Sequence, residues 1–294
     1  MYQPLYPARQ QYQRLRGVDY RLLRWGQAGA QPLLLLHGWM DSAETFQFML
    51  DAAPATLRNY DVIAPDWRGF GLSSWASEGY YFPDYLADLD TLLGWLAPAG
   101  PVALLGHSMG GIVAGLYAGI RPERVGKLIS LEGFGLPATQ PEQAPARYRR
   151  WLDEQAAGAS WGSLAGMEEM AARLQKTHAK LDGDQAAWLA AALTARSDEG
   201  WRYRADPRHR WVNPVLYRLE EAMACWREVS ADTLWLAGDE AKLLSWLGET
   251  TEQFALRRAC IARLQYQVLP GCGHNLHHDA PALVAQRVAD FLAQ

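Results

Sequence analysis

The stretch GHSMGG, residues 106–111, places one serine among small residues. The apolar run PVALL precedes it and the run IVAGLYAGI follows it, a pattern that indicates a buried strand passing into a helix. Glycines permit a strained turn between these elements, and such a turn leaves the hydroxyl of Ser108 exposed above the sheet. Ser108 is therefore a candidate nucleophile. It would need a histidine to take its proton, a carboxylate to orient that histidine and amide groups to bind the oxyanion.

A histidine that could take this proton lies in GCGHNLHHDAP, residues 271–281. His274 follows two glycines, which suit a tight turn that presents a side chain at the carboxyl edge of a sheet. We expect the nearby His277 and His278 to be surface histidines. No carboxylate or cysteine lies at metal-ligand spacing from these side chains, and the three cysteines of the chain are far apart. The sequence therefore predicts neither a metal site nor a cofactor.

The amide groups for an oxyanion have candidates in LLLLHGWMDS, residues 33–42, and in the residue after the serine. The backbone N–H groups of Trp39 and Met109 would together form an oxyanion hole. Each donor of this kind contributes about 3 kcal/mol to stabilising the transition state. We expect His37 to brace its loop through a hydrogen bond rather than to transfer protons, whereas the Trp39 side chain either lines the pocket or packs.

The elements that must position these residues alternate along the chain. Residues 11–26 alternate polar and apolar side chains and predict an edge hairpin. Short apolar runs typical of strands covered on both faces are PLLLLHG, YDVIAPD, PVALLGH, VGKLISLEG, DTLWLAGD and LQYQVLPG. Helical spacing follows in residues 85–96, 112–120 and 284–291, the last with Asp279 as expected N-cap and Pro281 in the first turn. This order predicts an α/β fold with a mostly parallel sheet and helices on both faces.

One segment, residues 135–230, lacks a good strand pattern and is too long for a loop. It carries several helical patterns and six tryptophans: Trp151, Trp161, Trp188, Trp201, Trp211 and Trp226. We predict an all-helical cap over 135–230 that covers an apolar, aromatic pocket, and a core domain over 1–134 and 231–294. We expect half or more of the tryptophan rings to pack the cap together rather than to line the pocket.

Composition limits the class of partner and the location of the protein. The chain has 294 residues, 20% of them charged, and a formal net charge of −4, so nothing attracts it to nucleic acid as a whole. We interpret RYRR and WRYRADPRHR as salt-bridged surface. The N-terminal stretch lacks the apolar centre of a signal peptide, and no apolar run approaches the roughly 20 residues that span a bilayer. We expect a cytoplasmic protein with no membrane span.

The order of strand, HGW, DWRGFGLS, GHSMGG, helical insertion and GCGH resembles the α/β-hydrolase family with a cap domain, over nearly the whole range 15–292. The resemblance implies an eight-stranded sheet, Ser108 as the nucleophile and His274 as the base. It implies the same two amides as oxyanion donors. Within DWRGFGLS, we expect Asp66 and Arg68 to brace loops rather than to perform chemistry.

The position of the carboxylate that would orient His274 departs from the family pattern. The family usually places an aspartate three residues after the glycine that ends the seventh strand, and here that position in LAGDEAKL is Ala241. Asp239 and Glu240 come too early. Some members place the acid at the end of the sixth strand, where LISLEGFG has Glu132. A carboxylate at that point has no packing value and is costly to bury unpaired. We therefore predict that Glu132 orients the base, with Asp239 as the next candidate.

The leading prediction is a serine hydrolase that cleaves an ester or related carbonyl substrate through a Ser–His–Glu triad and an acyl-enzyme. Serine as nucleophile argues against epoxide hydrolases and dehalogenases, which use aspartate in this fold. Cofactor-free C–C bond hydrolases, lactonases and aminopeptidases share the triad and stay open, as does a hydrolase-like binding protein without turnover. We expect a small-molecule substrate with an apolar portion, and a homodimer stays open.

Overall fold

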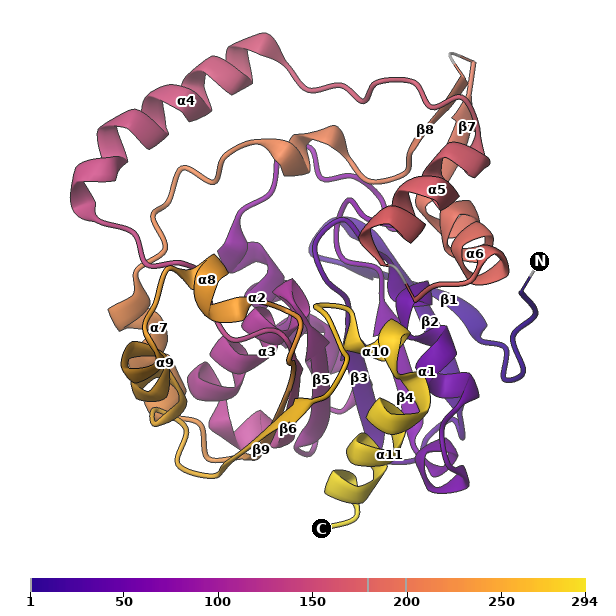
Figure 1. Cartoon of the computed structure of the whole chain (residues 1–294), viewed down its shortest axis with the longest axis vertical. Helices are drawn as coiled ribbons and strands as arrows, with labels where there is room; N and C mark the ends of the chain where they lie inside the picture. Colours follow the sequence, from indigo (N-terminus) through magenta and orange to yellow (C-terminus); the bar gives the residue numbers. More distant parts are fainter. Residues whose placement is uncertain (1, 179, 199) are drawn as a thin grey trace.

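In the described residues, 2–178, 180–198 and 200–294, the computed structural model has a central sheet of eight strands in the order β1-β2-β4-β3-β5-β6-β9-β10 (Figure 1). β2 pairs antiparallel with β1 and β4, and the other neighbouring pairs are parallel. The predicted sheet and its N-terminal hairpin are confirmed. The strands are β1 (Arg9–Leu15), β2 (Val18–Gly26), β3 (Pro32–Leu36), β4 (Asp61–Pro65), β5 (Val102–His107), β6 (Val125–Leu131), β9 (Asp232–Gly238) and β10 (Leu264–Leu269).

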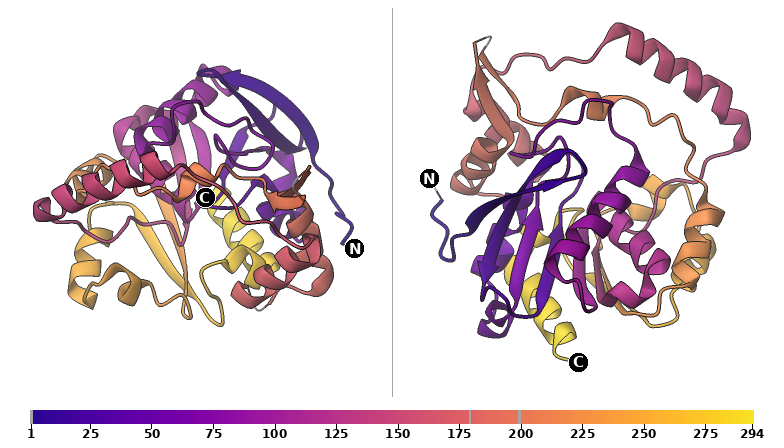
Figure 2. Two further views of the ribbon diagram at one scale, coloured as in Figure 1. Left: turned by 90° about the horizontal axis from the view of Figure 1, so that it is seen from above. Right: turned by 180° about the vertical axis from the view of Figure 1, so that it is seen from behind.

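Helices cover both faces of this sheet (Figures 1 and 2). Alternate residues of a strand point to opposite faces, so Leu33 and Leu35 of β3 join one buried cluster while Leu34 and Leu36 join the other. The first cluster contains residues of α1 (Gln47–Asp51), α10 (Leu276–Asp279) and α11 (Pro281–Leu292). The second contains residues of α2 (Phe82–Leu96), α3 (Met109–Ile120), α7 (Leu219–Arg227), α8 (Leu243–Leu247) and α9 (Thr251–Arg258), the last two of which lie between β9 and β10 in the chain.

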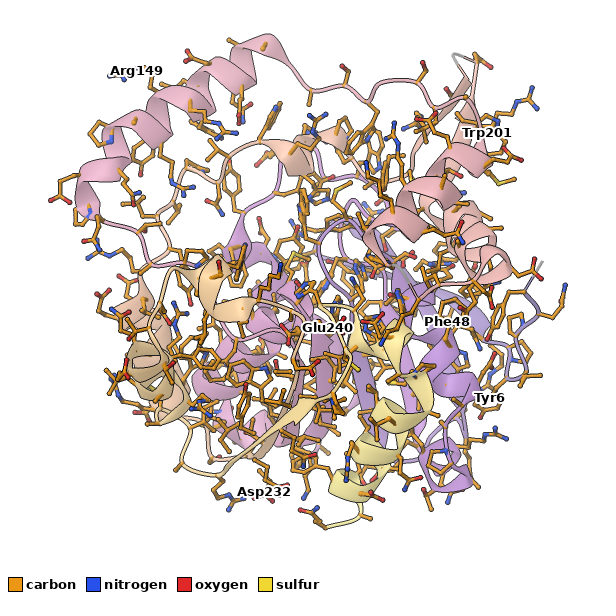
Figure 3. The ribbon with its side chains drawn as sticks, viewed as in Figure 1. Tyr6, Phe48, Arg149, Trp201, Asp232 and Glu240 are labelled. Carbon is orange, nitrogen blue, oxygen red and sulfur yellow. The ribbon has the colours of Figure 1, made fainter. Side chains whose placement is uncertain are left out.

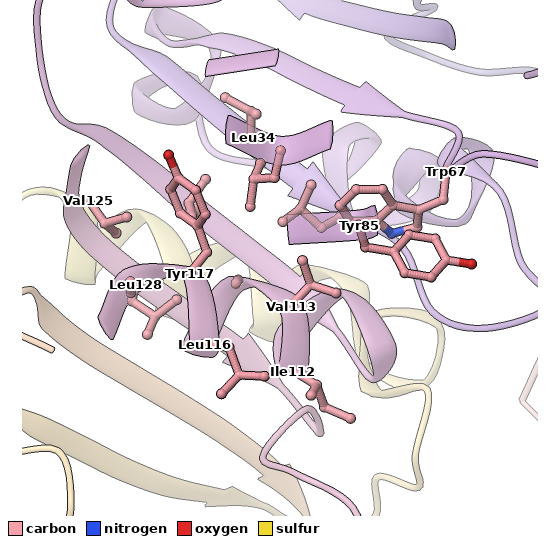
Figure 4. Close-up of a cluster of buried hydrophobic side chains, with 14 of the residues drawn as sticks. Leu34, Trp67, Tyr85, Ile112, Val113, Leu116, Tyr117, Val125 and Leu128 are labelled. Atoms are coloured by element: carbon pink, nitrogen blue, oxygen red, sulfur yellow. The ribbon is translucent and has the colours of Figure 1, made fainter. Parts of the chain in front are cut away.

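Helix α3, which follows the candidate nucleophile, is held firmly in the second cluster (Figure 4). Val113 and Tyr117 extend toward the side on which Leu34 of β3 lies, and Ile112, Val113 and Tyr117 are each less than a tenth exposed. A Cβ atom at Gly119 would clash with the Cys225 backbone, so α7 lies directly against α3. This packing fixes the axis of the helix that begins beside Ser108.

The segment 135–230 carries α4 (Ala144–Ala157), α5 (Met167–Thr177), α6 (Gly183–Leu193) and α7, and also β7 (Thr194–Ser197) and β8 (Gly200–Tyr203). β7 and β8 pair antiparallel, so the expectation of an all-helical segment is wrong. Each of the two strands has only four residues, and their sequences, TARS and GWRY, show little of the apolar alternation by which a strand is predicted.

Within this segment the packing is uneven. α5 and α6 form a small apolar cluster that includes Phe48 of α1, so this end is anchored on the core (Figure 3). Helix α4 stands away from the sheet in Figure 1 and in the right view of Figure 2, and has no buried residue among those described. It directs Arg149 outward (Figure 3).

The turn before α11 differs from the sequence prediction. Asp279 is not the N-cap of α11, because Ala280 occupies that position and the Asp279 carboxylate accepts a hydrogen bond from the Gly273 N–H at 2.7 Å. Asp279 therefore holds the turn before the last helices instead.

Among the helices of the described residues, none combines the length and apolar character needed to cross a membrane.

Candidate active site

Ser108 occupies a strained turn between β5 and α3. Its backbone angles are φ 49° and ψ −116°, a conformation that non-glycine residues rarely adopt. The glycines on either side make this turn feasible, because a Cβ at Gly106 would clash with the Gly110 backbone and one at Gly110 would clash with the Leu36 carbonyl. The Ser108 N–H donates to the Leu131 carbonyl at 2.9 Å, which ties the turn to the neighbouring strand.

His274 meets this serine from the loop after β10. Its Nε2 atom lies 2.9 Å from Ser108 Oγ, within hydrogen-bonding distance. Its side chain is 49% exposed, and its carbonyl accepts a hydrogen bond from His107 Nε2 at 2.9 Å. The backbone of His274 is thus fixed to the serine strand while its ring remains accessible from solvent.

Glu132 reaches the other side of the same imidazole. It follows β6 with φ 53°, and its N–H donates to the Leu236 carbonyl at 3.1 Å. Its side chain is fully buried; Oε1 accepts from the Gly238 N–H at 2.6 Å, and Oε2 lies 3.7 Å from His274 Nδ1. In the described part of the chain Oε2 has no hydrogen-bond partner, so it is free to accept from that ring nitrogen after a small movement.

The competing carboxylates lie elsewhere. Asp239 is exposed and its Oδ1 accepts from the Cys272 N–H at 3.2 Å, so it braces the loop that leads to the histidine. Glu240 is also exposed, beyond the end of β9 (Figure 3). The structure thus brings together Ser108, His274 and Glu132, as the sequence predicts.

The two predicted oxyanion donors border the cavity that contains Ser108. Met109 is the first residue of α3, so its N–H has no acceptor within the helix. Trp39 follows Gly38, where a Cβ would lie 3.3 Å from Ser108 Cβ, so this loop lies directly against the serine. The Trp39 ring is 54% exposed, lines the cavity and donates through Nε1 to the His209 carbonyl at 3.3 Å.

His37, Asp66 and Arg68 hold loops in place through hydrogen bonds and ion pairs, as expected. His37 is fully buried; its Nδ1 lies 2.7 Å from the Gly38 carbonyl and its Nε2 accepts from the Trp67 N–H at 2.9 Å. Burial lowers the His37 pKa to about 4, so the ring stays neutral. The Asp66 carboxylate accepts from Arg21 and two backbone N–H groups, and Arg68 pairs with the buried carboxylate of Asp88.

The expectation that His277 and His278 lie on the surface is wrong. They are 0% and 4% exposed, because α10 turns them inward against η1 (Ala43–Phe46), where both Nε2 atoms contact Thr45 Oγ1. Burial lowers the pKa of His277 well below its usual range and that of His278 to about 3. Sequence spacing could not reveal this, since Thr45 is distant in the chain.

A cavity of about 650 Å³ opens beside these groups. It is lined by Trp39, Phe82, Ser108, Met109, Ile112, Glu132, Gly135, Leu136, Ala241, Lys242, Leu243, Ser245, Trp246 and His274. The sequence analysis did not predict that Phe82 and residues of α8 line the cavity. The apolar run LLSWL, which follows Gly238 at the end of β9, could have indicated a wall of this kind.

The predicted cap contributes less to this cavity than expected. Its share of the wall is Gly135 and Leu136, which precede α4. A second, smaller cavity shares Trp39, Phe82 and Met109 with the first, and it is there that Trp151 and Trp211 lie. The other tryptophans of the segment do not line either cavity in the described residues; Trp226, for example, stacks on Phe134 in the core.

Comparison with known proteins places the chain in a family. Residues 31–281 match the family model described as alpha/beta hydrolase fold. A serine hydrolase-like protein of Danio rerio is 25% identical over 91% of this chain and 83% of its own length. A 2-hydroxymuconate semialdehyde hydrolase of Pseudomonas sp. (strain CF600) is 30% identical over 90% of this chain and 87% of its own. The solved thioesterase domain from the curacin biosynthetic pathway superposes with a TM-score of 0.83 at 26% identity, over 96% of this chain and 98% of that one. The chain belongs to the α/β-hydrolase fold family and is similar to serine hydrolase-like proteins.

Proposed function

We propose that this protein is a serine hydrolase that cleaves a carboxylic ester through Ser108, His274 and Glu132. The observation that carries the proposal is the contact of 2.9 Å between Ser108 Oγ, at a strained turn, and His274 Nε2. On the other side of the same ring, the buried Oε2 atom of Glu132 lies 3.7 Å from His274 Nδ1. A nucleophile, a base and an orienting acid in this order are the requirement for acyl transfer by serine.

In the proposed reaction, His274 Nε2 takes the proton of Ser108 Oγ as the oxygen attacks the ester carbonyl carbon. The carbonyl oxygen becomes an oxyanion and accepts hydrogen bonds from the N–H groups of Trp39 and Met109. Collapse of this intermediate breaks the bond to the alcohol, which leaves with the proton from His274. Water then attacks the acyl-enzyme by the same route, and the acid is released.

Glu132 has an electrostatic and a positioning role in this scheme. In the proposed reaction its Oε2 accepts a hydrogen bond from the Nδ1–H group of His274, which keeps Nε2 free to take the serine proton and stabilises the imidazolium that forms. Its Oε1 is held by the Gly238 N–H, so the carboxylate cannot rotate freely away from the ring.

The cavity favours a substrate with an apolar portion. Ile112, Leu136, Leu243 and Trp246 line it near the serine, and its volume of about 650 Å³ is within the range of small-molecule sites. Apolar walls of this kind bind acyl or alcohol chains by burying their surface.

The proposal is tested by labelling and by turnover. A fluorophosphonate probe should modify the wild-type protein at Ser108, identified by peptide mass spectrometry, and should not modify Ser108→Ala. Hydrolysis of p-nitrophenyl esters of increasing acyl length then gives the preferred size. Absence of both labelling and ester turnover in folded protein would contradict the proposal.

A C–C bond hydrolase is the second candidate, on the strength of the 2-hydroxymuconate semialdehyde hydrolase that is 30% identical over 90% of this chain. The same serine and histidine would serve such a reaction. Turnover of 2-hydroxymuconate semialdehyde that exceeds that of every ester in kcat/KM would favour this candidate over the first.

A further inference from the structure

Behind the proposed nucleophile lies a group of buried histidines that the proposed reaction does not use. His107, the residue before Ser108, is 3% exposed, and His277 is fully buried. Their ring centroids are 4.4 Å apart. Asp41, two residues after Trp39, joins them from the loop after β3 and is partly exposed. One ligand-forming atom from each of Asp41, His107 and His277 lies within 4.8 Å of the other two.

The hydrogen bond of His107 determines which ring nitrogen is free. His107 Nε2 lies 2.9 Å from the His274 carbonyl oxygen, which can only accept, so this nitrogen carries the hydrogen. His107 Nδ1 therefore carries the lone pair. It is buried and has no hydrogen-bond partner in the part of the chain that the structure describes. A buried acceptor without a partner is costly unless a ligand satisfies it.

Thr45 contacts both neighbouring histidines. His278 Nε2 donates to the Thr45 carbonyl at 3.1 Å and contacts Thr45 Oγ1 at 2.8 Å. His277 Nε2 lies 2.9 Å from the same hydroxyl oxygen, so this ring nitrogen has a partner. His277 Nδ1, by contrast, is buried and has no hydrogen-bond partner among the described residues, so it is the second ring nitrogen that a ligand could satisfy.

We propose that Asp41, His107 and His277 form a binding site for a divalent transition-metal ion, with Zn²⁺ as the best match. Two imidazole nitrogens and one carboxylate are a ligand set that suits Zn²⁺ and excludes Ca²⁺ and Mg²⁺, which prefer oxygen. Ligand distances of about 2.0–2.2 Å place tetrahedral neighbours roughly 3.3–3.6 Å apart, so the three ligand atoms, which lie within 4.8 Å of one another, would draw closer together around the ion. Burial raises the pKa of Asp41 to about 7, and a bound dication would favour its charged form.

The three ligands belong to three separate segments. Asp41 lies on the loop that carries Trp39, His107 ends β5 just before Ser108, and His277 is on α10. A bound ion joins these segments and so stabilises the fold around the site without touching the reacting atoms. The partly exposed Asp41 gives the ion its route from solvent. This inference does not depend on the proposed ester hydrolysis.

The test uses the full-length protein, stripped with EDTA, desalted and titrated with Zn²⁺ by calorimetry. We expect one ion per chain, and a rise in melting temperature of about 5 °C when free Zn²⁺ exceeds Kd a hundredfold. Asp41→Asn and His277→Gln should each weaken binding by about tenfold or more. The control His274→Gln, which removes the exposed histidine and leaves its carbonyl in place, should bind Zn²⁺ as the wild type does.

A second measurement covers variants that do not fold. Co²⁺ added to the stripped wild-type protein should give the intense visible bands of a tetrahedral nitrogen and oxygen site, at one equivalent, and Zn²⁺ should displace them. Failure of the wild type to bind one ion overturns the proposal. So does a Co²⁺ spectrum with only the weak bands of the hydrated ion, loss of binding in His274→Gln, or unchanged binding in both ligand variants.

Discussion

The strand ends of the core and the inserted segment 135–230 contribute very different things to the candidate site. Ser108, Glu132 and His274 all belong to the core. Ser108 and Glu132 directly follow β5 and β6, and His274 lies in the loop after β10. Among its described residues, the inserted segment supplies only Gly135 and Leu136 to the cavity around them. The groups proposed to react are thus placed by the sheet, while the segment affects the space that a substrate would fill.

Packing explains this division. Ser108 and Glu132 both adopt positive φ, and each is tied by its backbone N–H to a neighbouring strand. Such strain persists only where the surrounding structure enforces it. Helix α4 lacks buried residues among those described, so its position is weakly enforced. Substitutions at the strand ends should therefore abolish the reaction, and substitutions in the segment should change which substrates react.

The largest effect is expected for Ser108→Ala. Removing the nucleophile of such a triad lowers kcat by roughly 10⁶. Alanine tolerates the same φ of 49° no worse than serine does, so the fold should persist. The measurement is ester turnover at equal protein concentration, with circular dichroism and thermal unfolding as the control. Ester hydrolysis at the wild-type rate by the purified variant would exclude the serine mechanism.

The next effect separates the two carboxylates at this edge of the sheet. In Glu132→Gln the amide oxygen can keep the hydrogen bond from the Gly238 N–H, which turns the NH₂ group toward His274 Nδ1. The ring then carries its hydrogen on Nε2, the wrong tautomer to accept a proton, and kcat should fall by about 10⁴.

Asp239→Asn is the matched control for this variant. An asparagine oxygen can still accept from the Cys272 N–H, so kcat should stay within about twofold of wild type. If the asparagine variant is the inactive one and the glutamine variant keeps near-normal kcat, the assignment of the acid is wrong.

The sequence was sufficient for the parts of the site that local pattern specifies. Apolar runs of strand length predicted the sheet, and GHSMGG and GCGH predicted where Ser108 and His274 would meet. The absence of an acid at Ala241 directed attention to Glu132, because parallel strands bring their carboxyl ends to one edge. These features depend on periodicity and on glycine, both of which can be read from neighbouring residues.

The parts that escaped prediction depend on contacts between distant segments. His277 and His278 are buried because Thr45 pairs with both, and no local pattern links these positions. Strands β7 and β8 are held by each other and by α6 rather than by apolar alternation. The wall from α8 depends on how the loop after β9 folds back over the serine.

A pH-dependent effect tests a point where the inserted segment is packed like the core. His209 stacks between Phe70 and Tyr80, and burial lowers its pKa to about 3. The unfolded chain binds a proton there below about pH 6.5, whereas the folded chain stays neutral until about pH 3. The stability that His209 contributes is therefore present above pH 6.5 and lost as the pH falls from there toward 3, by about 2 kcal/mol between pH 7 and pH 5.

The measurement is urea unfolding of wild type and His209→Gln at both pH values. Other buried histidines titrate in both proteins and cancel in the difference. The stability advantage of the wild type should shrink by about 2 kcal/mol at pH 5 relative to pH 7. An advantage that is equal at the two pH values would mean that His209 is protonated in the folded protein or that its ring is not enclosed.

The smallest effect belongs to α4. Trp151 lines the small cavity that adjoins the cavity at Ser108, whereas Leu152, next to it on the same helix, is 59% exposed. If a long substrate extends from one cavity into the other, Trp151→Ala removes a contact of some 50 Å², worth about 1.4 kcal/mol or tenfold in KM. The effect should appear only for the longest esters, with kcat unchanged, because Trp151 touches none of the proposed reacting groups. Leu152→Ala should leave every KM as it was. An equal loss for short and long esters in Trp151→Ala would mean that α4 acts on the reaction itself, and the division between strand ends and inserted segment would fail at that point.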